Sequence, residues 1–146
     1  MDISMSLYSK HYFGVAQYMY EHADKYGLNR EEMFVLGLLH DIGKVYSPIN
    51  HEEKGAMLMS HLGYKMATFI AWHGTDPQSY MQSRMVEDIP NELRLLWEAD
   101  MSIDGLGQNV GYEGRLLDIK ERYGEESGVY ETCVAIVEYL RKENEE

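Results

Sequence analysis

The sequence predicts an all-α fold, a single compact bundle of about six to seven helices that forms one domain over residues 1–146. Apolar residues recur at helical spacing along most of the chain. Glycines and helix-capping residues separate these runs. No internal repeat, linker or pair of alternating apolar strands interrupts the pattern, and 146 residues are enough for one domain with a sizeable core.

The ends of the first helices are marked by residue types that cap helices. Gly27 is expected to close the first helix, because glycine readily adopts the left-handed conformation of a helix C-terminus. Asn29 is an N-cap candidate with glutamates in the turn that follows it. Gly63 is expected to stop the third helix. These signals place the first three helices at about residues 6–26, 29–43 and 50–63.

Apolar periodicity predicts the later helices at about residues 64–73, 92–103, 112–123 and 128–142. The polar stretch between Gln78 and Asn91 is ambiguous and would allow one more short helix. Cys133 lies in an apolar helical pattern, so we expect it in the core. The glycine-rich segment 105–111 lacks the preceding strand and the spacing of a phosphate-binding fingerprint, so we interpret it as a flexible connection.

The chain carries a formal net charge of −12, from 25 acidic and 13 basic residues. Binding a long nucleic acid requires a basic face, so this balance argues against such a partner. A small anionic substrate is compatible with it, because bound cations can dominate the local field. No apolar run approaches a membrane span, and the first residues lack the features of a secretory signal. The single cysteine indicates a reducing, cytoplasmic environment.

An apolar helical run at residues 33–39 leads directly into the adjacent His40 and Asp41. Burying an ionised carboxylate there costs several kcal/mol unless a cation or hydrogen bonds compensate it. An imidazole beside a carboxylate is a good pair of ligands for a divalent metal. The alternative is a core histidine that is hydrogen-bonded to the neighbouring aspartate, and the pair alone would favour it. Further His and Asp residues along the chain favour the metal.

The HDIGK stretch at residues 40–44, with His11 before it and Asp100 after it, resembles the HD-domain superfamily of metal-dependent phosphohydrolases. The resemblance covers roughly residues 8–106, and HDIGK is its most specific part. It implies an HD-domain helical bundle with a metal site at its centre. It also implies that Asp41 is a catalytic residue.

The resemblance further implies two divalent metal ions. One would be held by His11, His40, Asp41 and Asp100, and Asp41 would bridge to a second ion held by His51 and His73. His22 points the same way as His11 but lies roughly 16 Å further along the helix axis, so the two cannot share a metal. The family pattern selects His11. Without that pattern, His51 would fit equally well as a polar residue in a first helical turn.

Lys44 is expected to bind substrate phosphate, as a second catalytic residue beside Asp41. Its alternative interpretation is a solvated charge that complements a helix C-terminus. Arg84, Arg94 and Arg115 could also meet phosphate, and the sequence does not select one. Histidine and carboxylate ligands fit Fe, Mn, Zn, Co or Ni without choosing among them. Asp104 shares a face with Asp100 and is expected either to support the ligands or to be solvated.

HD proteins that hydrolyse cyclic dinucleotides carry two consecutive histidines and a Gly-Tyr-Pro signature, whereas this chain has Trp72-His73 and no such signature. A single histidine here resembles the bacterial HD phosphohydrolases that split symmetrical dinucleoside tetraphosphates. We therefore expect a metal-dependent phosphohydrolase that uses a metal-activated water. The expected substrate is a small phosphorylated compound, foremost a nucleotide or dinucleoside polyphosphate.

Two alternatives remain open. Some HD proteins with a similar ligand set are mixed-valent diiron oxygenases, which would make this protein an oxygenase that cleaves a small phosphonate or polyol. A degenerate HD module could instead sense a nucleotide without turnover, although the intact His40-Asp41 pair counts against it. No nucleic-acid polymer and no membrane is expected as a partner, and the sequence leaves a homo-oligomer open.

Overall fold

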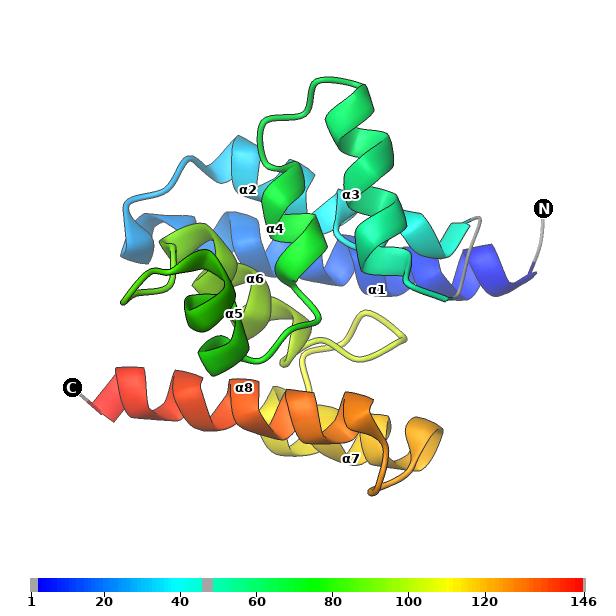
Figure 1. Cartoon of the computed structure of the whole chain (residues 1–146). Coiled ribbons are helices and arrows are strands. Elements are labelled where there is room, and N and C mark those ends of the chain that lie inside the picture. The colour runs from blue at the N-terminus through cyan, green and yellow to red at the C-terminus, as the bar shows by residue number, and fades with distance from the viewer. Residues whose placement is uncertain (1–2, 46–48, 146) are drawn as a thin grey trace.

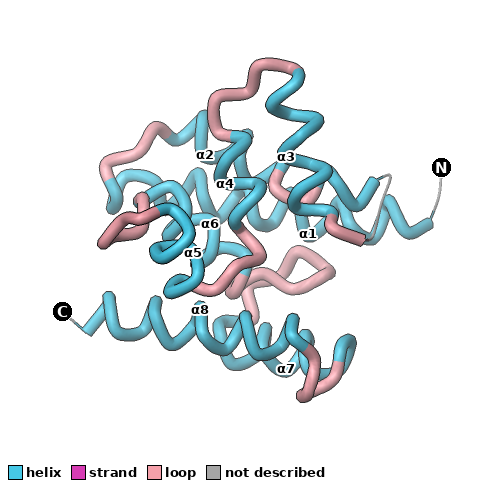
Figure 2. The backbone as a smooth tube through the Cα atoms, in the orientation of Figure 1, coloured by secondary structure: helices cyan, strands magenta, loops and turns pink. Residues whose placement is uncertain are grey.

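The computed structural model describes residues 3–45 and 49–145, and every named element within them is helical, which confirms the predicted all-α class (Figures 1 and 2). The only β-type pairing in these residues is an isolated bridge between Ile103 and Asn109. Nor does any helix of the described residues combine the length and apolar character needed to cross a membrane. The elements, with η for a 3-10 helix, are α1 (Ile3–His22), η1 (Ala23–Tyr26), α2 (Arg30–Leu39), η2 (Ile42–Val45), α3 (His51–His61), α4 (Ala67–Trp72), α5 (Pro77–Arg84), α6 (Asn91–Asp100), α7 (Gly111–Tyr123) and α8 (Gly128–Glu145).

The two caps predicted near the N-terminal end are confirmed. Gly27 closes η1 in the left-handed conformation, with φ of 68°. The Asn29 side chain accepts the backbone N–H of Glu32 at 2.8 Å and so starts α2. The short connection between them lets α2 pack along α1, as Figure 1 shows.

Helix α6 is the central element and contacts α1, α2, η1 and α8. It is buried on several faces, as expected for a helix in the middle of a bundle. The Trp97 indole N–H donates to the carbonyl of His73 at 2.9 Å, which fixes α6 against the end of α4. Asp100, the last residue of α6, is therefore held in a rigid frame. The buried residues of α6 are Leu93, Leu95, Leu96, Trp97, Glu98 and Ala99.

The second helix is shorter than its prediction, which extended it to Gly43. It ends at Leu39, and His40 and Asp41 form a turn before η2, where the Lys44 backbone N–H donates to the Asp41 carbonyl at 2.9 Å. The start of α3 packs tightly on η2, because a Cβ built on Gly43 would lie 1.9 Å from the carbonyl oxygen of His51. This close approach accounts for the glycine in the HDIGK stretch.

The ambiguous stretch after residue 76 contains a short helix, α5. With it, the described residues contain eight α-helices, one more than the upper end of the predicted six to seven. The Asp76 side chain accepts the Ser79 backbone N–H at 2.9 Å, and Pro77 occupies the first turn, where its missing N–H costs nothing. The helix ends at Arg84, because Met85 takes a left-handed conformation with φ of 56°.

Helices α7 and α8 pair along one side of the bundle and are joined to α6 by a loop (Figure 1). We expected this loop to be a flexible connection, but it is extensively hydrogen-bonded. The Asp104 carboxylate accepts the backbone N–H groups of Leu106 and Gln108 at 2.9 and 3.0 Å. Cys133, on α8, is 8% exposed, which confirms its predicted core position.

Candidate metal centre

Four of the six predicted ligands, from α1, α6 and the turn after α2, converge in the interior. His11 Nε2 lies 2.9 Å from Asp100 Oδ1 and 3.9 Å from Asp41 Oδ2. His40 Nε2 lies 3.3 Å from Asp41 Oδ2 and 3.5 Å from Asp100 Oδ1. His40 is completely buried, and His11 is 5% exposed. Two carboxylates and two imidazoles thus point at one small volume.

The other two predicted ligands approach Asp41 from its opposite oxygen. His51 Nε2, at the start of α3, and His73 Nε2, after the end of α4, each lie 3.1 Å from Asp41 Oδ1. The oxygen Oδ2 faces His11 and His40, so the two oxygens of one carboxylate divide the four histidines into two adjacent pairs. All six predicted residues are therefore brought together. His22 is not, because its ring stacks on Tyr18 and its Nδ1 hydrogen-bonds the Tyr18 carbonyl.

Backbone carbonyls fix the orientation of three histidine rings. Nδ1 of His11 lies 3.1 Å from the Asp104 carbonyl, and Nδ1 of His40 and His73 lies 2.6 Å from the carbonyls of Gly37 and Ile70. A carbonyl only accepts, so each Nδ1 carries a proton and donates it. In the neutral ring, Nε2 then presents a lone pair to the cluster. This is the orientation that metal-binding histidines usually have.

The donor set fits a metal on structural grounds. His40 Nε2 is buried and has no hydrogen-bond partner among the described residues. The lone pair of a histidine Nε2 atom repels a carboxylate oxygen that it faces. A proton or a metal cation between the two atoms removes this repulsion. Among the described residues, three overlapping groups of side chains have the spacing to hold an ion: His11, His40 and Asp100; His40, Asp41 and His73; and His51, Glu52 and His73.

The pKa values show how the cluster behaves without metal. Burial by itself lowers the pKa of His40, but the carboxylates of Asp41 and Asp100 outweigh it and raise this pKa to about 10. Burial likewise raises the pKa of Asp41, yet the His40 charge and hydrogen bonds from His51 and His73 bring it well below its usual range. The pKa of Asp100 is also lowered strongly, against its burial, by His11 and His40. Protons thus supply the positive charge that a metal would replace.

Two cationic side chains border the cluster. Lys44 Nζ lies 3.4 Å from Asp41 Oδ2; burial lowers the Lys44 pKa, but Asp41 and Tyr123 raise it further, so the ammonium stays charged. Arg115, on α7, donates from Nε to the Asp100 carbonyl at 2.9 Å and from Nη1 to Asp118 at 2.9 Å. Of the three arginines that the sequence left open, Arg115 is the one at this site.

The other two arginines lie elsewhere. Arg94 pairs with Asp88 and lies 3.6 Å from Glu143. Arg84 is exposed at the end of α5. Neither lines the cavity over the cluster.

Sequence reasoning missed the contribution of Glu52 and, although it allowed Asp104 a supporting role, the backbone route by which Asp104 acts. Glu52 Oε1 lies 3.2 Å from His51 Nε2 and adds a carboxylate to the second histidine pair. Its adjacency to His51 was the available signal. Asp104 supports the site through its backbone carbonyl, which orients His11, while its side chain holds the following loop. No residue-type pattern could reveal the role of a carbonyl.

A cavity of about 530 Å³, here called the metal-site cavity, opens over the cluster. Its lining includes Asp41, His51, His73 and Asp100, with His11 and His40 lying behind them. The α7–α8 pair forms the facing wall. Cys133 lines it too, and burial raises the pKa of its thiol to about 12, so the thiol is protonated in the metal-free protein.

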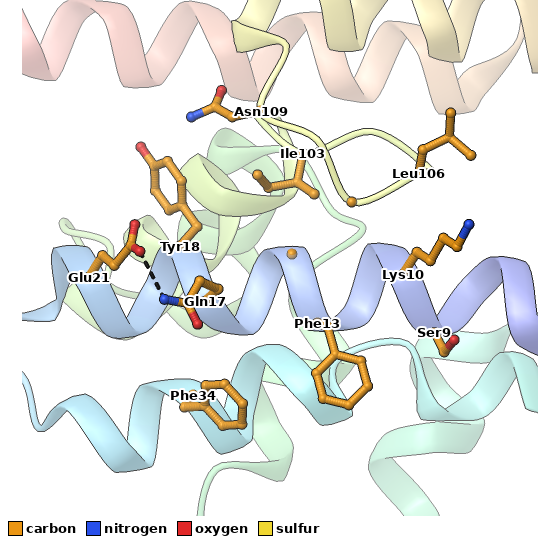
Figure 3. Close-up of a pocket in the computed structure, with 12 residues that line it drawn as sticks. Ser9, Lys10, Phe13, Gln17, Tyr18, Glu21, Phe34, Ile103, Leu106 and Asn109 are labelled. Atoms are coloured by element: carbon orange, nitrogen blue, oxygen red, sulfur yellow. Dashed lines mark hydrogen bonds between the residues drawn. The ribbon is translucent and has the colours of Figure 1, made fainter.

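A second cavity, of about 610 Å³, lies between α1 and the loop at 103–109 (Figure 3). Its lining contains no histidine or cysteine, and its single carboxylate, Glu21, accepts a hydrogen bond from Gln17 at 2.8 Å. Phe13 and Leu106 stand at its edges, both more than half exposed. Of these two cavities, only the metal-site cavity has a cluster of side chains that could hold a metal ion.

A comparison with protein families identifies the core of the chain. The family model described as HD domain matches residues 8–105, which is more than half of the sequence. The match begins within α1, continues through α6, includes all six predicted ligands and ends before α7. No curated protein and no solved structure is similar enough to count as a match.

Proposed function

The chain belongs to the HD domain family, and from this premise we propose that it is a metal-dependent phosphohydrolase acting on a small phosphorylated compound. The observation that carries the proposal is the division of the histidines by Asp41, with Oδ2 towards His11 and His40 and Oδ1 towards His51 and His73. A carboxylate in that position suits a bridge between two adjacent divalent ions. Asp100 completes the first group, and Glu52 is available to the second.

Two divalent ions, when bound, lower the pKa of a water and stabilise charge on the attacking and leaving oxygens of a phosphoryl group. The protein then has little covalent chemistry to perform, and its residues mainly bind and orient. Lys44 offers its ammonium to a phosphate oxygen at the cavity wall. Arg115 fixes Asp100 by hydrogen-bonding its carbonyl. Glu52 Oε1, which lines the cavity, can accept a proton.

The proposed substrate is a nucleotide, including dinucleoside polyphosphates. The single His73 and the missing Gly-Tyr-Pro signature support a linear nucleotide over a cyclic dinucleotide. The net charge of −12 supports a small substrate over a nucleic-acid polymer, because it disfavours a long phosphate backbone while metals and Lys44 can hold one phosphate group.

The test uses protein loaded with Mn²⁺ or Fe²⁺ and a panel of nucleotides and phosphoesters in ¹⁸O-labelled water. Hydrolysis should place the label in the released phosphate or nucleotide without oxygen consumption. Asp41→Ala should abolish turnover, because it removes the bridging carboxylate. Oxygen uptake coupled to cleavage, with the protein in a mixed-valent diiron state, would overturn the proposal in favour of an oxygenase.

Lys44→Ala should separate substrate binding from metal binding. Removing a charged hydrogen bond to phosphate should raise KM about 10- to 100-fold while the metal content stays unchanged. Lys65→Ala is the matched control, because Lys65 forms a surface ion pair with Glu32 and does not line the metal-site cavity. Loss of metal in Lys44→Ala, or an equal KM change in both variants, would contradict the role of Lys44.

A further inference from the structure

The metal-site cavity has two chemically different walls. One wall carries the metal cluster and Lys44, all within the family-matched residues 8–105. The other wall is lined by residues of α7 and α8. These two helices lie beyond that segment and run side by side along one side of the bundle (Figure 1). The catalytic chemistry and the facing wall therefore come from different parts of the chain, and the facing wall is where substrate preference can be set.

The α7–α8 wall is mostly apolar. Ile119 and Ile136 line the cavity but are only 2% and 1% exposed, so they form its packed backing. Tyr123, at the end of α7, and Val129, at the start of α8, also line it and are 51% and 48% exposed. These two side chains present apolar surface at the mouth of a cavity whose other wall is highly charged.

The ring of Tyr123 has no aromatic partner among the described residues. Within the part of the chain that the structure describes, it stacks on no other ring or side-chain cation, and its hydroxyl makes no hydrogen bond. A half-exposed tyrosine gains free energy when a flat apolar group covers its face. Asn50 and Thr132 also line the cavity and offer hydrogen-bonding groups alongside the apolar wall.

We propose that Tyr123 and Val129 form a stacking platform for the base of a nucleoside monophosphate whose phosphate lies at the metal cluster. The inference rests on the proposed function, because the metal cluster and Lys44 define the phosphate end. The platform supplies the planar apolar contact that a base requires, and Asn50 and Thr132 supply partners for sugar hydroxyls. A volume of about 530 Å³ is in the range of small-molecule sites.

The experiment compares three phosphate esters with the metal-loaded full chain: adenosine monophosphate, phenyl phosphate and glycerol phosphate. Tyr123→Ala should raise KM for adenosine monophosphate about 5- to 100-fold, the effect expected for losing one base–aromatic stack. It should leave glycerol phosphate unchanged, because that substrate has no ring. Tyr123→Phe keeps the ring and should behave as the wild type.

Leu117→Ala is the matched control, since Leu117 is on the same helix, is 57% exposed and does not line the cavity. An equal effect of Tyr123→Ala on all three esters, no effect on any, or the same loss in Tyr123→Phe overturns the platform. A loss for phenyl phosphate as large as that for adenosine monophosphate assigns the platform to aryl phosphates and overturns the nucleoside assignment.

Failure of the proposed function is distinguishable from failure of the platform. A wild-type protein that hydrolyses neither these esters nor any compound of the nucleotide and phosphoester panel contradicts the proposed function. Calorimetric titration of adenosine monophosphate into the metal-loaded protein then tests the platform by itself. A Kd raised about 5- to 100-fold in Tyr123→Ala supports it, and an unchanged Kd overturns it.

Discussion

Glu98 and Asp41 are equally buried carboxylates, each 3% exposed, but their neighbours differ in kind. Glu98 is surrounded by donors: the Tyr18 hydroxyl at 2.9 Å, the Lys25 ammonium at 2.7 Å and the Tyr26 hydroxyl at 3.2 Å. Asp41 has one ammonium neighbour, Lys44 Nζ at 3.4 Å, and otherwise faces histidine Nε2 atoms. Most of those histidine rings already donate their Nδ1 proton to the backbone. The fold alone satisfies Glu98, whereas the histidine Nε2 atoms around Asp41 require protons or a metal cation between them and the Asp41 oxygens.

The same chemical change at these two carboxylates should therefore have different results. Glu98→Gln leaves Lys25 without its carboxylate and should lower the free energy of unfolding by about 1–3 kcal/mol, with metal content unchanged. Asp41→Asn should remove metal, because an amide is a poor bridging ligand. Denaturant unfolding with and without chelator, together with elemental analysis, measures both. The contrast is refuted if Glu98→Gln loses its metal or Asp41→Asn keeps all of it.

Among the elements, the close contact of η2 with α3 decides whether His51 reaches Asp41. Gly43 permits that contact, and Gly55 lies on the opposite side of it, where a Cβ would be 3.0 Å from the Gly43 nitrogen. Two glycines at this contact let the start of α3 approach the turn that carries Asp41. The distance of 3.1 Å between His51 Nε2 and Asp41 Oδ1 depends on that approach.

Gly43→Ala should therefore separate the two histidine pairs. The new methyl group would overlap the His51 carbonyl, so α3 must move, at a cost of about 1–3 kcal/mol in stability. We expect the metal held by His51 and His73 to be lost while the group at His11 and His40 remains, as elemental analysis can show. Gly128→Ala is the control, because a Cβ there meets nothing within 4 Å. Unchanged metal content in Gly43→Ala would show that the contact is not needed.

Helix positions were largely predictable because capping and periodicity depend on local sequence, and the residues that converge at the candidate site were predictable from a resemblance. Asn29 and Gly27 have side-chain or backbone properties that act within one turn. The six proposed ligands were found because their residue types and order resemble a family, and the structure brings all of them together. The predicted end of α2, at Gly43, lies too far along the chain. The packing of α3 against Gly43, rather than helix propensity, sets the backbone conformation after Leu39.

Contacts made through the backbone or across long separations were not predictable. The Asp104 carbonyl orients His11 across 93 residues, and any residue type could supply a carbonyl. Arg115 could not be chosen over Arg84 and Arg94 until α7 was placed against α6. The facing wall of the cavity likewise depends on how α7 and α8 pack, and the resemblance at the HDIGK stretch carries no information about that.

At the scale of the whole molecule, the metal cluster joins α1, α3, α6 and the segments after α2 and α4. A metal that binds only the folded state stabilises all of these elements at once. Without metal, protonated His40 provides part of the needed charge, because its pKa is raised from 6.5 to about 10. Metal binding must displace that proton, so metal and proton compete for the same interior site.

Chelation should lower the melting temperature, and the size of the drop should depend on pH. Free metal at about 100 times Kd stabilises the folded protein by about 2.7 kcal/mol, which for a chain of this size corresponds to about 5–10 °C in melting temperature.

In the chelated protein, the stability due to protonated His40 is complete below pH 6.5 and is lost as pH rises towards about 10. The metal-loaded protein has no such loss, because His40 carries no Nε2 proton there. The gap between the two melting temperatures, followed by calorimetry or circular dichroism, should therefore widen across that pH range. Equal melting temperatures with and without chelator at every pH would show that the cluster holds no metal, and a gap that narrows as pH rises would contradict the competition between metal and proton.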